Sequence, residues 1–242
     1  MGWGGDHTAW AFQIPALAAE FDVIALDNRG AGQSDAPDRR FTIADMADDV
    51  IGLMDELGVR TAHICGASMG GMIAQELALR HPERVLTLQL HCTASGVDGY
   101  GRLVIDNFLR VKARGDTEEF VYFSLPWLLA RKTFVENAGF IEAWIERALE
   151  YPFKTSLVGM SRQGEAIRGH DTRARLSEVR VPTLITTGTE DILVPPSASE
   201  ELHRLIPGSE LRRLPDAAHM HFIEQASMFN EISLDFLRKY RS

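Results

Sequence analysis

One serine of the sequence lies in a setting that suits nucleophilic chemistry. The motif Gly66-Ala67-Ser68-Met69-Gly70 follows the apolar run Thr61–Cys65 and precedes a helix-compatible segment, Met72–Arg80. A Gly-x-Ser-x-Gly pattern between a strand and a helix is typical of a nucleophile elbow, a sharp turn that lifts the serine hydroxyl clear of the backbone. Glycines permit the turn because the strained serine backbone leaves no room for neighbouring Cβ atoms. The pattern predicts Ser68 as a nucleophile.

A serine hydroxyl is a poor nucleophile until a base takes its proton, and the base must be oriented by a third group. The chain offers both groups downstream, each in a loop that follows a predicted strand. Asp191 comes after the strand Thr183–Thr187, and His219 comes after the strand Glu210–Leu214. The coincidence of three strand ends favours a Ser68, Asp191, His219 arrangement.

Other residues compete for the last two roles. His221 is the strongest rival of His219, but it begins the apolar run toward the last helix. Glu190 and Asp216 lie in the same two loops and compete with Asp191. An aspartate in a loop is usually a turn former, but the coincidence of three strand ends favours Asp191 as the functional one. We expect His219 and Asp191, with these three residues as the alternatives.

Composition narrows the class of protein. The chain has 242 residues and a net charge of −9, which argues against nucleic acid and anionic membranes as partners. No apolar run approaches the ~20 residues that span a bilayer, and the N-terminus lacks the basic and apolar regions of a signal peptide. Two cysteines make no disulfide framework, which predicts a cytoplasmic setting, and Cys65 is expected to be a small buried filler.

Strand-like runs alternate with helix-like runs, which predicts an α/β fold with a mostly parallel, doubly wound sheet. The predicted strands are Val23–Leu26, Thr61–Cys65, Val85–Leu90, Thr183–Thr187 and Glu210–Leu214. The predicted helices that accompany them run from a Thr42 cap to Leu57, over Met72–Arg80, over Ser197–Leu205 and over Glu224–Arg238.

The middle of the chain has a different pattern. Strand signals vanish, and four amphipathic helices are predicted, over Leu103–Arg114, Glu118–Leu129, Val135–Leu149 and Leu157–Ile167. A helical block between two βα stretches predicts a lid over the edge of the sheet where ligands bind. The predicted division is 1–94 and 170–242 for the core and 95–169 for the lid. Four aromatic side chains could line a pocket beneath the lid or pack it onto the core: Trp127, Trp144, Phe123 and Phe140.

The lid is also rich in basic side chains. One of them could hold a substrate carboxylate, although such side chains more often form a solvated helix face. They are Arg102, Arg110, Lys112, Arg114, Arg131, Lys132, Arg147, Lys154, Arg162 and Arg168.

Over nearly its whole length the chain resembles the α/β-hydrolase fold family, in particular its lidded esterases, enol-lactonases and perhydrolases. The motifs that carry the resemblance are Gly2-Trp3-Gly4-Gly5, Asp27–Ser34, Gly66–Gly71, Val181–Leu184 with Gly188 and Asp191, and His219 with Glu224. The resemblance implies that Ser68 is the nucleophile, His219 the general base and Asp191 the group that orients it. It also implies an oxyanion hole made by the backbone N–H groups of Met69 and Trp3, and no metal or organic cofactor.

The chain departs from the family pattern at its start. Family members usually carry first strands before the motif at Gly2, with a His-Gly pair where Met1-Gly2 stands. The expected fold is therefore an α/β-hydrolase fold whose N-terminal strands are missing. A shortened chain, another segment in the same place and pairing with a second copy would each account for this, and we favour the first.

The function that these features imply is hydrolysis of a carboxylic ester or lactone through an acyl-enzyme on Ser68, with acyl-homoserine lactones and enol-lactones included. The expected partner is this small-molecule substrate, and the oligomeric state is left open. The alternatives are a perhydrolase, a C–C bond hydrolase of ring-cleavage diketones, and a slow-turnover ligand receptor on the same fold.

Overall fold

The sheet of this protein has four parallel strands in the order β1-β2-β3-β4. The computed structural model describes residues 1–241. The strands are β1 (Ala62–Ala67), β2 (Val85–His91), β3 (Thr183–Gly188) and β4 (Glu210–Leu214). Four of the five predicted strands are thus confirmed.

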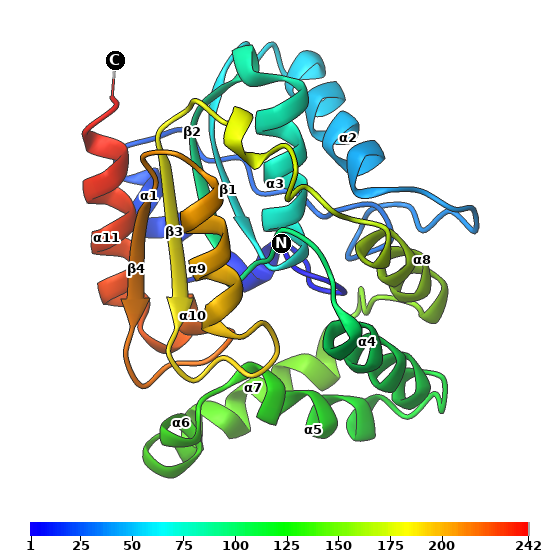
Figure 1. Cartoon of the computed structure of the whole chain (residues 1–242). Helices are drawn as coiled ribbons and strands as arrows, with labels where there is room; N and C mark the ends of the chain where they lie inside the picture. The colour runs from blue at the N-terminus through cyan, green and yellow to red at the C-terminus, as the bar shows by residue number, and fades with distance from the viewer. Residues whose placement is uncertain (242) are drawn as a thin grey trace.

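Helices surround the sheet and form most of the remaining structure (Figure 1). In chain order the α-helices are α1 (Ile14–Ala18), α2 (Ile43–Glu56), α3 (Met69–Arg80), α4 (Gly99–Lys112), α5 (Thr117–Leu128), α6 (Arg131–Glu136), α7 (Ala138–Glu150), α8 (Leu157–Arg168), α9 (Pro196–Leu205), α10 (His221–Glu224) and α11 (Ala226–Arg238). Short 3₁₀ helices cover His7–Trp10, Pro82–Arg84 and Leu176–Glu178.

Alternate residues of β2 face opposite layers of helices, as the period of a strand requires. Leu88 and Leu90 belong to a core cluster shared with α3 and α9. On the other face, Gln89 accepts a hydrogen bond from the α11 hydroxyl of Ser233 at 2.8 Å. Both faces of β2 are buried, which explains why the run Val85–His91 contains so few charged side chains.

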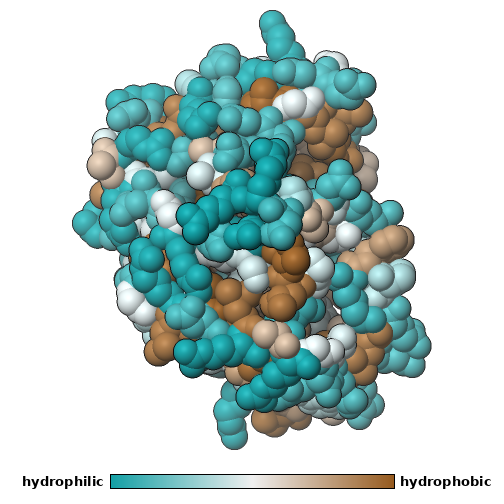
Figure 2. Space-filling view, turned by 90° about the vertical axis from the view of Figure 1, so that its right-hand side faces the viewer, coloured by the Kyte–Doolittle hydropathy of each residue, from teal (hydrophilic) through white to brown (hydrophobic). Residues whose placement is uncertain are grey.

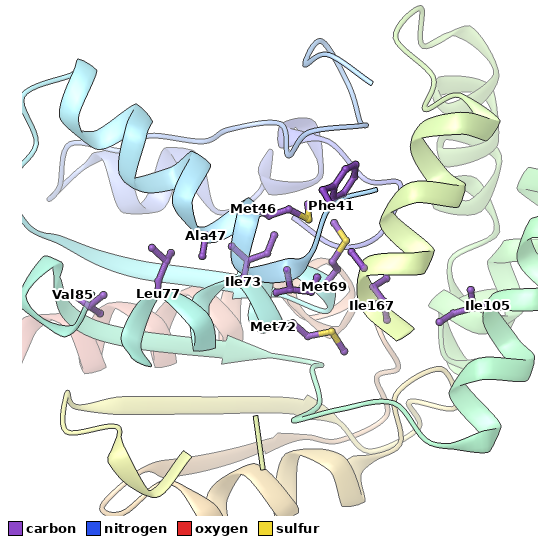
Figure 3. Packing of buried hydrophobic residues seen from close by; sticks show 12 residues of the cluster. Phe41, Met46, Ala47, Met69, Met72, Ile73, Leu77, Val85, Ile105 and Ile167 are labelled. Atoms are coloured by element: carbon purple, nitrogen blue, oxygen red, sulfur yellow. The ribbon is translucent and has the colours of Figure 1, made fainter. Parts of the chain in front are cut away.

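The helix that starts at the elbow anchors one core cluster. Met69, Met72, Ile73 and Leu77 of α3 pack against Met46 and Ala47 of α2, together with Phe41 and Ile167 (Figure 3). Helix α2 is held at its start by a capping box between Thr42 and Asp45, and Gly58 follows its end with a φ of 69°. Because α3 is packed on its buried face, the turn before it has a fixed position.

Helices α4 to α8 lie between β2 and β3 in the chain, and α5, α6 and α7 lie beyond the carboxyl ends of the strands (Figure 1). The expected helix Val135–Leu149 is interrupted at Asn137, where the chain leaves helical geometry with φ −131° and ψ 49°. This residue ends α6 and begins α7. The division into a core and a lid stays a prediction.

Two expectations about the first half of the chain are wrong. Val23–Leu26 forms no strand, because a strand needs a neighbour for its backbone hydrogen bonds and, in the described part of the chain, β1 pairs only with β2. Cys65 is exposed rather than buried, because it lies on that outer strand. The described residues therefore place no strand on the outer edge of β1.

Within residues 1–241, every helix is too short or too polar to cross a membrane. On the side of the molecule that carries α4 and α8, hydrophilic residues cover most of the surface and hydrophobic ones show between them (Figure 2).

Candidate active site

Ser68 occupies the turn between β1 and α3 in a strained backbone conformation. Its φ of 55° and ψ of −120° lie outside the regions that residues with a side chain normally adopt. Two hydrogen bonds hold it there: its N–H donates to His91 O at 2.8 Å, and its carbonyl accepts from Thr93 Oγ1 at 2.7 Å. Strain that the surroundings maintain in this way is typical of functional sites.

Two glycines leave the space that this turn needs. A Cβ on Gly66 would lie 2.1 Å from the carbonyl oxygen of Gly70, so only glycine fits between β1 and α3 at this point. A Cβ on Gly2 would lie 3.0 Å from Ser68 Cβ and 3.5 Å from Ser68 Oγ. The backbone of Gly2 is therefore directly beside the serine side chain.

Asp191 and His219 meet where the loops after β3 and β4 run side by side. His219 Nδ1 lies 2.8 Å from Asp191 Oδ2, and both side chains are buried. The second carboxylate oxygen of Asp191 accepts hydrogen bonds from the N–H groups of Leu193 and Val194, each at 2.9 Å. A carboxylate fixed by two backbone donors holds the imidazole in one orientation and favours the proton on Nδ1.

The three competing residues take other roles. Glu190 is exposed, and Asp216 is an exposed turn residue with a φ of 54° that pairs with Lys132 at 3.0 Å. His221 is fully buried and has its Nε2 2.7 Å from Thr186 Oγ1. None of the three lines the cavity described below.

His221 ends a buried polar chain behind the site. Thr186 Oγ1 lies 2.7 Å from His221 Nε2 and also 2.7 Å from His91 Nδ1. Burial, and then the charge of His219, lowers the pKa of His221 to about 3. Burial, and then His221, also lowers the pKa of His91 well below its ordinary value. Both rings are therefore neutral near pH 7.

A cavity of about 1000 Å³ contains both Ser68 and His219 in its wall. No hydrogen bond joins Ser68 Oγ to a partner in the described part of the chain, so the hydroxyl is free to turn toward the imidazole when a substrate is bound. Phe140 and Trp144 line this cavity as well.

Phe123 and Trp127 do not line the cavity, which corrects that part of the expectation. Their rings lie 5.0 Å and 5.9 Å from the ring of Phe108, in a cluster that also contains Met160. They bury their area against other helices of the same block. The sequence spacing could not distinguish the two pairs, because each pair is four residues apart.

Met69 and Trp3, whose backbone N–H groups are expected to form an oxyanion hole, both line the same cavity. Neither donates to an acceptor in residues 1–241. Trp3 is held by its ring, whose Nε1 donates to Met160 O at 2.8 Å, and the next residue, Gly4, donates through its N–H to Gln163 Oε1 at 2.9 Å. Helix α8 thus fixes the turn beside Ser68.

Glu224 contributes contacts that its place in the sequence motif did not reveal. Its Oε2 accepts from the N–H of Ala218 at 2.7 Å, and its Oε1 accepts from the N–H of Ala130 at 2.7 Å and from Thr133 Oγ1 at 2.5 Å. The N–H of Met220 donates to Leu128 O at 2.9 Å. Both neighbours of His219 are therefore attached to the corner between α5 and α6 or to Glu224.

Asp6, His7 and Asp27 form the one group of three potential metal-binding side chains in residues 1–241. Their possible ligand atoms all lie within 4.8 Å of one another. These atoms already have partners. His7 Nδ1 lies 2.8 Å from Asp27 Oδ1, and Asp6 Oδ1 accepts from Thr8 N and Thr8 Oγ1 at 2.8 and 2.6 Å. The cluster holds together the turn before the first 3₁₀ helix.

The model of the alpha/beta hydrolase fold family matches residues 1–226. This chain belongs to that family. In this α/β hydrolase Ser68 follows β1, Asp191 follows β3 and His219 follows β4, which gives the order Ser, Asp, His along the chain.

Relatives of this α/β hydrolase include a protein of Azorhizobium caulinodans named "Putative carbamate hydrolase RutD", which is 32% identical over 97% of this chain and 88% of the relative. Among solved structures, the enol-lactonase from Burkholderia xenovorans LB400 is 30% identical with a TM-score of 0.88, and covers 98% of this chain and 88% of its own. A thermophilic esterase from Thermogutta terrifontis is 29% identical with a TM-score of 0.88, over 100% of this chain and 88% of its own.

Proposed function

We propose that this α/β hydrolase is a serine hydrolase that cleaves a carboxylic ester or lactone through an acyl-enzyme on Ser68. The observation that carries the proposal is the hydrogen bond of 2.8 Å that Asp191 Oδ2 makes with Nδ1 of His219, a residue that lines the same cavity as Ser68. The similarity to an esterase and an enol-lactonase supports the choice of an acyl substrate.

In the proposed reaction Ser68 Oγ attacks the carbonyl carbon of the substrate while His219 Nε2 takes the hydroxyl proton. The carbonyl oxygen becomes an oxyanion, which the N–H groups of Met69 and Trp3 stabilise. The C–O bond to the alcohol then breaks, and His219 gives its proton to the leaving oxygen. One such N–H donor is typically worth about 10²- to 10³-fold in rate.

Water completes the turnover. It attacks the acyl-enzyme with His219 as the base, releases the acid and returns the proton to Ser68. In a lactone the leaving alcohol stays attached to the acyl group, so the same steps open the ring. A carbamate carbonyl is open to the same attack, and the relative with a carbamate hydrolase name makes carbamates a second group to assay. No step requires a metal or an organic cofactor.

The test is covalent labelling with a fluorophosphonate, which phosphonylates an activated serine, followed by intact-mass analysis. Wild type should gain one label and Ser68→Ala none. Esters, lactones and carbamates are then assayed with both proteins. A folded wild type that takes no label, or a Ser68→Ala protein that is labelled equally, would refute the proposal.

A further inference from the structure

Within the helical block α4–α8, three basic side chains of the cavity wall have no acidic partner. They are Lys112 at the end of α4, Arg147 in α7 and Lys154 in the loop between α7 and α8. Within residues 1–241, no carboxylate oxygen lies within 4.0 Å of their side-chain nitrogens. An unpaired cation that lines a cavity is available to bind an anionic ligand.

The other basic side chains of the helical block behave differently. None of the other seven lines the cavity, and four of them pair with carboxylates: Arg114, Lys132, Arg162 and Arg168. In residues 1–241, the remaining three have no carboxylate partner but lie outside the cavity wall: Arg110, Arg131 and Arg102, which donates to Arg168 O at 3.1 Å. In this helical block, the three cations that line the cavity all lack a carboxylate partner, whereas most of the others have one.

The acidic side chains of the wall are fewer, and each has donors of its own. Asp6 accepts from Thr8, Asp98 accepts from the N–H of Gly101, and Glu201 accepts from Ser95 and Arg173. Including Arg173 and Arg204, the wall carries five basic side chains against three acidic ones, in a chain of net charge −9. A cleft lined by an excess of one charge concentrates the opposite charge from solution.

Lys112 is the least exposed of the three cations. Its ammonium lies 4.9 Å from the centre of the Phe120 ring, so an aromatic face rather than a carboxylate supports it. Burial, and then the like charge of Lys154, lowers its pKa. Two repelling ammonium groups gain most from an anion placed near both.

The loop that carries Lys154 is attached to the turn beside Ser68. Thr155, the next residue, donates through Oγ1 to the carbonyl of Gly4 at 2.9 Å. Gly4 belongs to the same turn as Gly2, which contacts the Ser68 side chain. Lys154 is therefore held close to the turn of Ser68, and all three cations line the same cavity as the serine.

We infer that the substrate is an ester or lactone that carries a second, ionised carboxylate, which binds Lys112, Arg147 and Lys154 while its reacting carbonyl lies at Ser68. This inference rests on the proposed function for the reaction, but the anion site is a property of the cavity and can be measured without turnover.

The experiment uses two esters of equal length, monomethyl glutarate and methyl valerate, which differ only in a terminal carboxylate or methyl group. Their dissociation constants for the Ser68→Ala protein are measured by NMR titration. We expect the anionic ester to bind about tenfold tighter, and Lys112→Gln, Arg147→Gln or Lys154→Gln to weaken it about two- to fivefold each, as for partly exposed ion pairs. The neutral ester should be unaffected.

Arg110→Gln is the matched control, since it removes an unpaired cation of the same helical block from outside the cavity. Equal binding of the two esters, or an equal loss in Arg110→Gln, would overturn the inference. The binding experiment uses Ser68→Ala and needs no turnover, so it tests only the anion site. The proposed function is tested separately, by fluorophosphonate labelling and turnover of wild type.

Discussion

Glu224 Oε2 accepts a hydrogen bond of 2.7 Å from the backbone N–H of Ala218, the residue before His219. The other oxygen of the same carboxylate binds Ala130 and Thr133 in the helical block. One side chain thus joins the loop of the proposed base to helices that are about ninety residues away in the chain. Glu224 is a positioning residue in the proposed mechanism.

Glu224→Gln should lower kcat about tenfold and leave KM nearly unchanged. Both carboxylate oxygens face donors, so the amide must turn one N–H group toward another donor and lose a charge-assisted hydrogen bond, typically worth about 1.5–3 kcal/mol. Steady-state kinetics and the rate of fluorophosphonate labelling at saturating probe measure the effect.

Glu20→Gln is the control for this variant. It removes a half-buried carboxylate that pairs with Arg238 at 2.5 Å, and Glu20 does not line the cavity. Both variants should unfold at a lower temperature than wild type, but only Glu224→Gln should label slowly. Equal labelling rates would show that Glu224 stabilises the fold without positioning His219.

Asp191→Asn should reduce kcat about 10³- to 10⁴-fold at neutral pH, as is typical when the orienting carboxylate of a triad becomes an amide. Asparagine Oδ1 can keep the hydrogen bonds from Leu193 and Val194, which turns its N–H group toward His219 Nδ1. The imidazole then carries its proton on Nε2 and cannot accept one from Ser68. Kinetics of Asp191→Asn and Asp216→Asn decide the point, because the exposed Asp216 should be replaceable without loss.

Gly2→Ala should lower kcat/KM about tenfold with little change in folding. The new Cβ would lie 3.0 Å from Ser68 Cβ, which is closer than ordinary contacts allow, and the turn of Trp3 would have to move. Gly52→Ala is the matched control, since a Cβ there meets nothing within 4 Å. It lies inside α2 and should raise the free energy of unfolding by roughly 0.5–1 kcal/mol. Unchanged activity in Gly2→Ala would remove this turn from the proposed oxyanion site.

The buried His221 predicts a loss of stability in acid. Its pKa is about 3 in the folded protein, below the ordinary value of 6.5, so the unfolded chain binds the proton more readily. The stabilising contribution is complete above pH 6.5 and is lost as the pH falls from 6.5 toward 3. At pH 5 the loss from this residue is about 2 kcal/mol.

Urea unfolding of wild type and His221→Gln at pH 7.5 and pH 5 measures this contribution. The glutamine variant should lose less stability between the two pH values. Identical pH dependence in wild type and His221→Gln would contradict the prediction.

Local signals made much of the fold predictable. The Thr42 cap and Gly58 delimit α2, and the elbow motif places Ser68 between a strand and a helix. Asp191 and His219 could be chosen because each follows a strand, and parallel strands bring their carboxyl ends to one edge of a sheet. Their hydrogen bond of 2.8 Å follows from that topology.

Features that depend on distant partners were not predictable. Val23–Leu26 has the composition of a strand, but pairing depends on a neighbour that the segment itself does not encode. Phe123 and Phe140 look alike in the sequence, yet only Phe140 reaches the cavity, because the packing of each helix decides which face is hidden. The partners of Glu224 are also distant in the chain, so its motif gave no sign of them.

Helix α7 supplies Phe140, Trp144 and Arg147 to the cavity wall, yet none of its residues is fully buried. Substitutions at exposed positions usually change the free energy of unfolding by less than about 0.5 kcal/mol. Helix α8 tolerates fewer substitutions, since a Cβ on Gly159 would lie 2.0 Å from Gly30 O. The exposed wall positions of α7, Ala143 and Arg147, can therefore change at little cost to folding, so related enzymes should diverge in substrate preference there first, while α8 stays constrained.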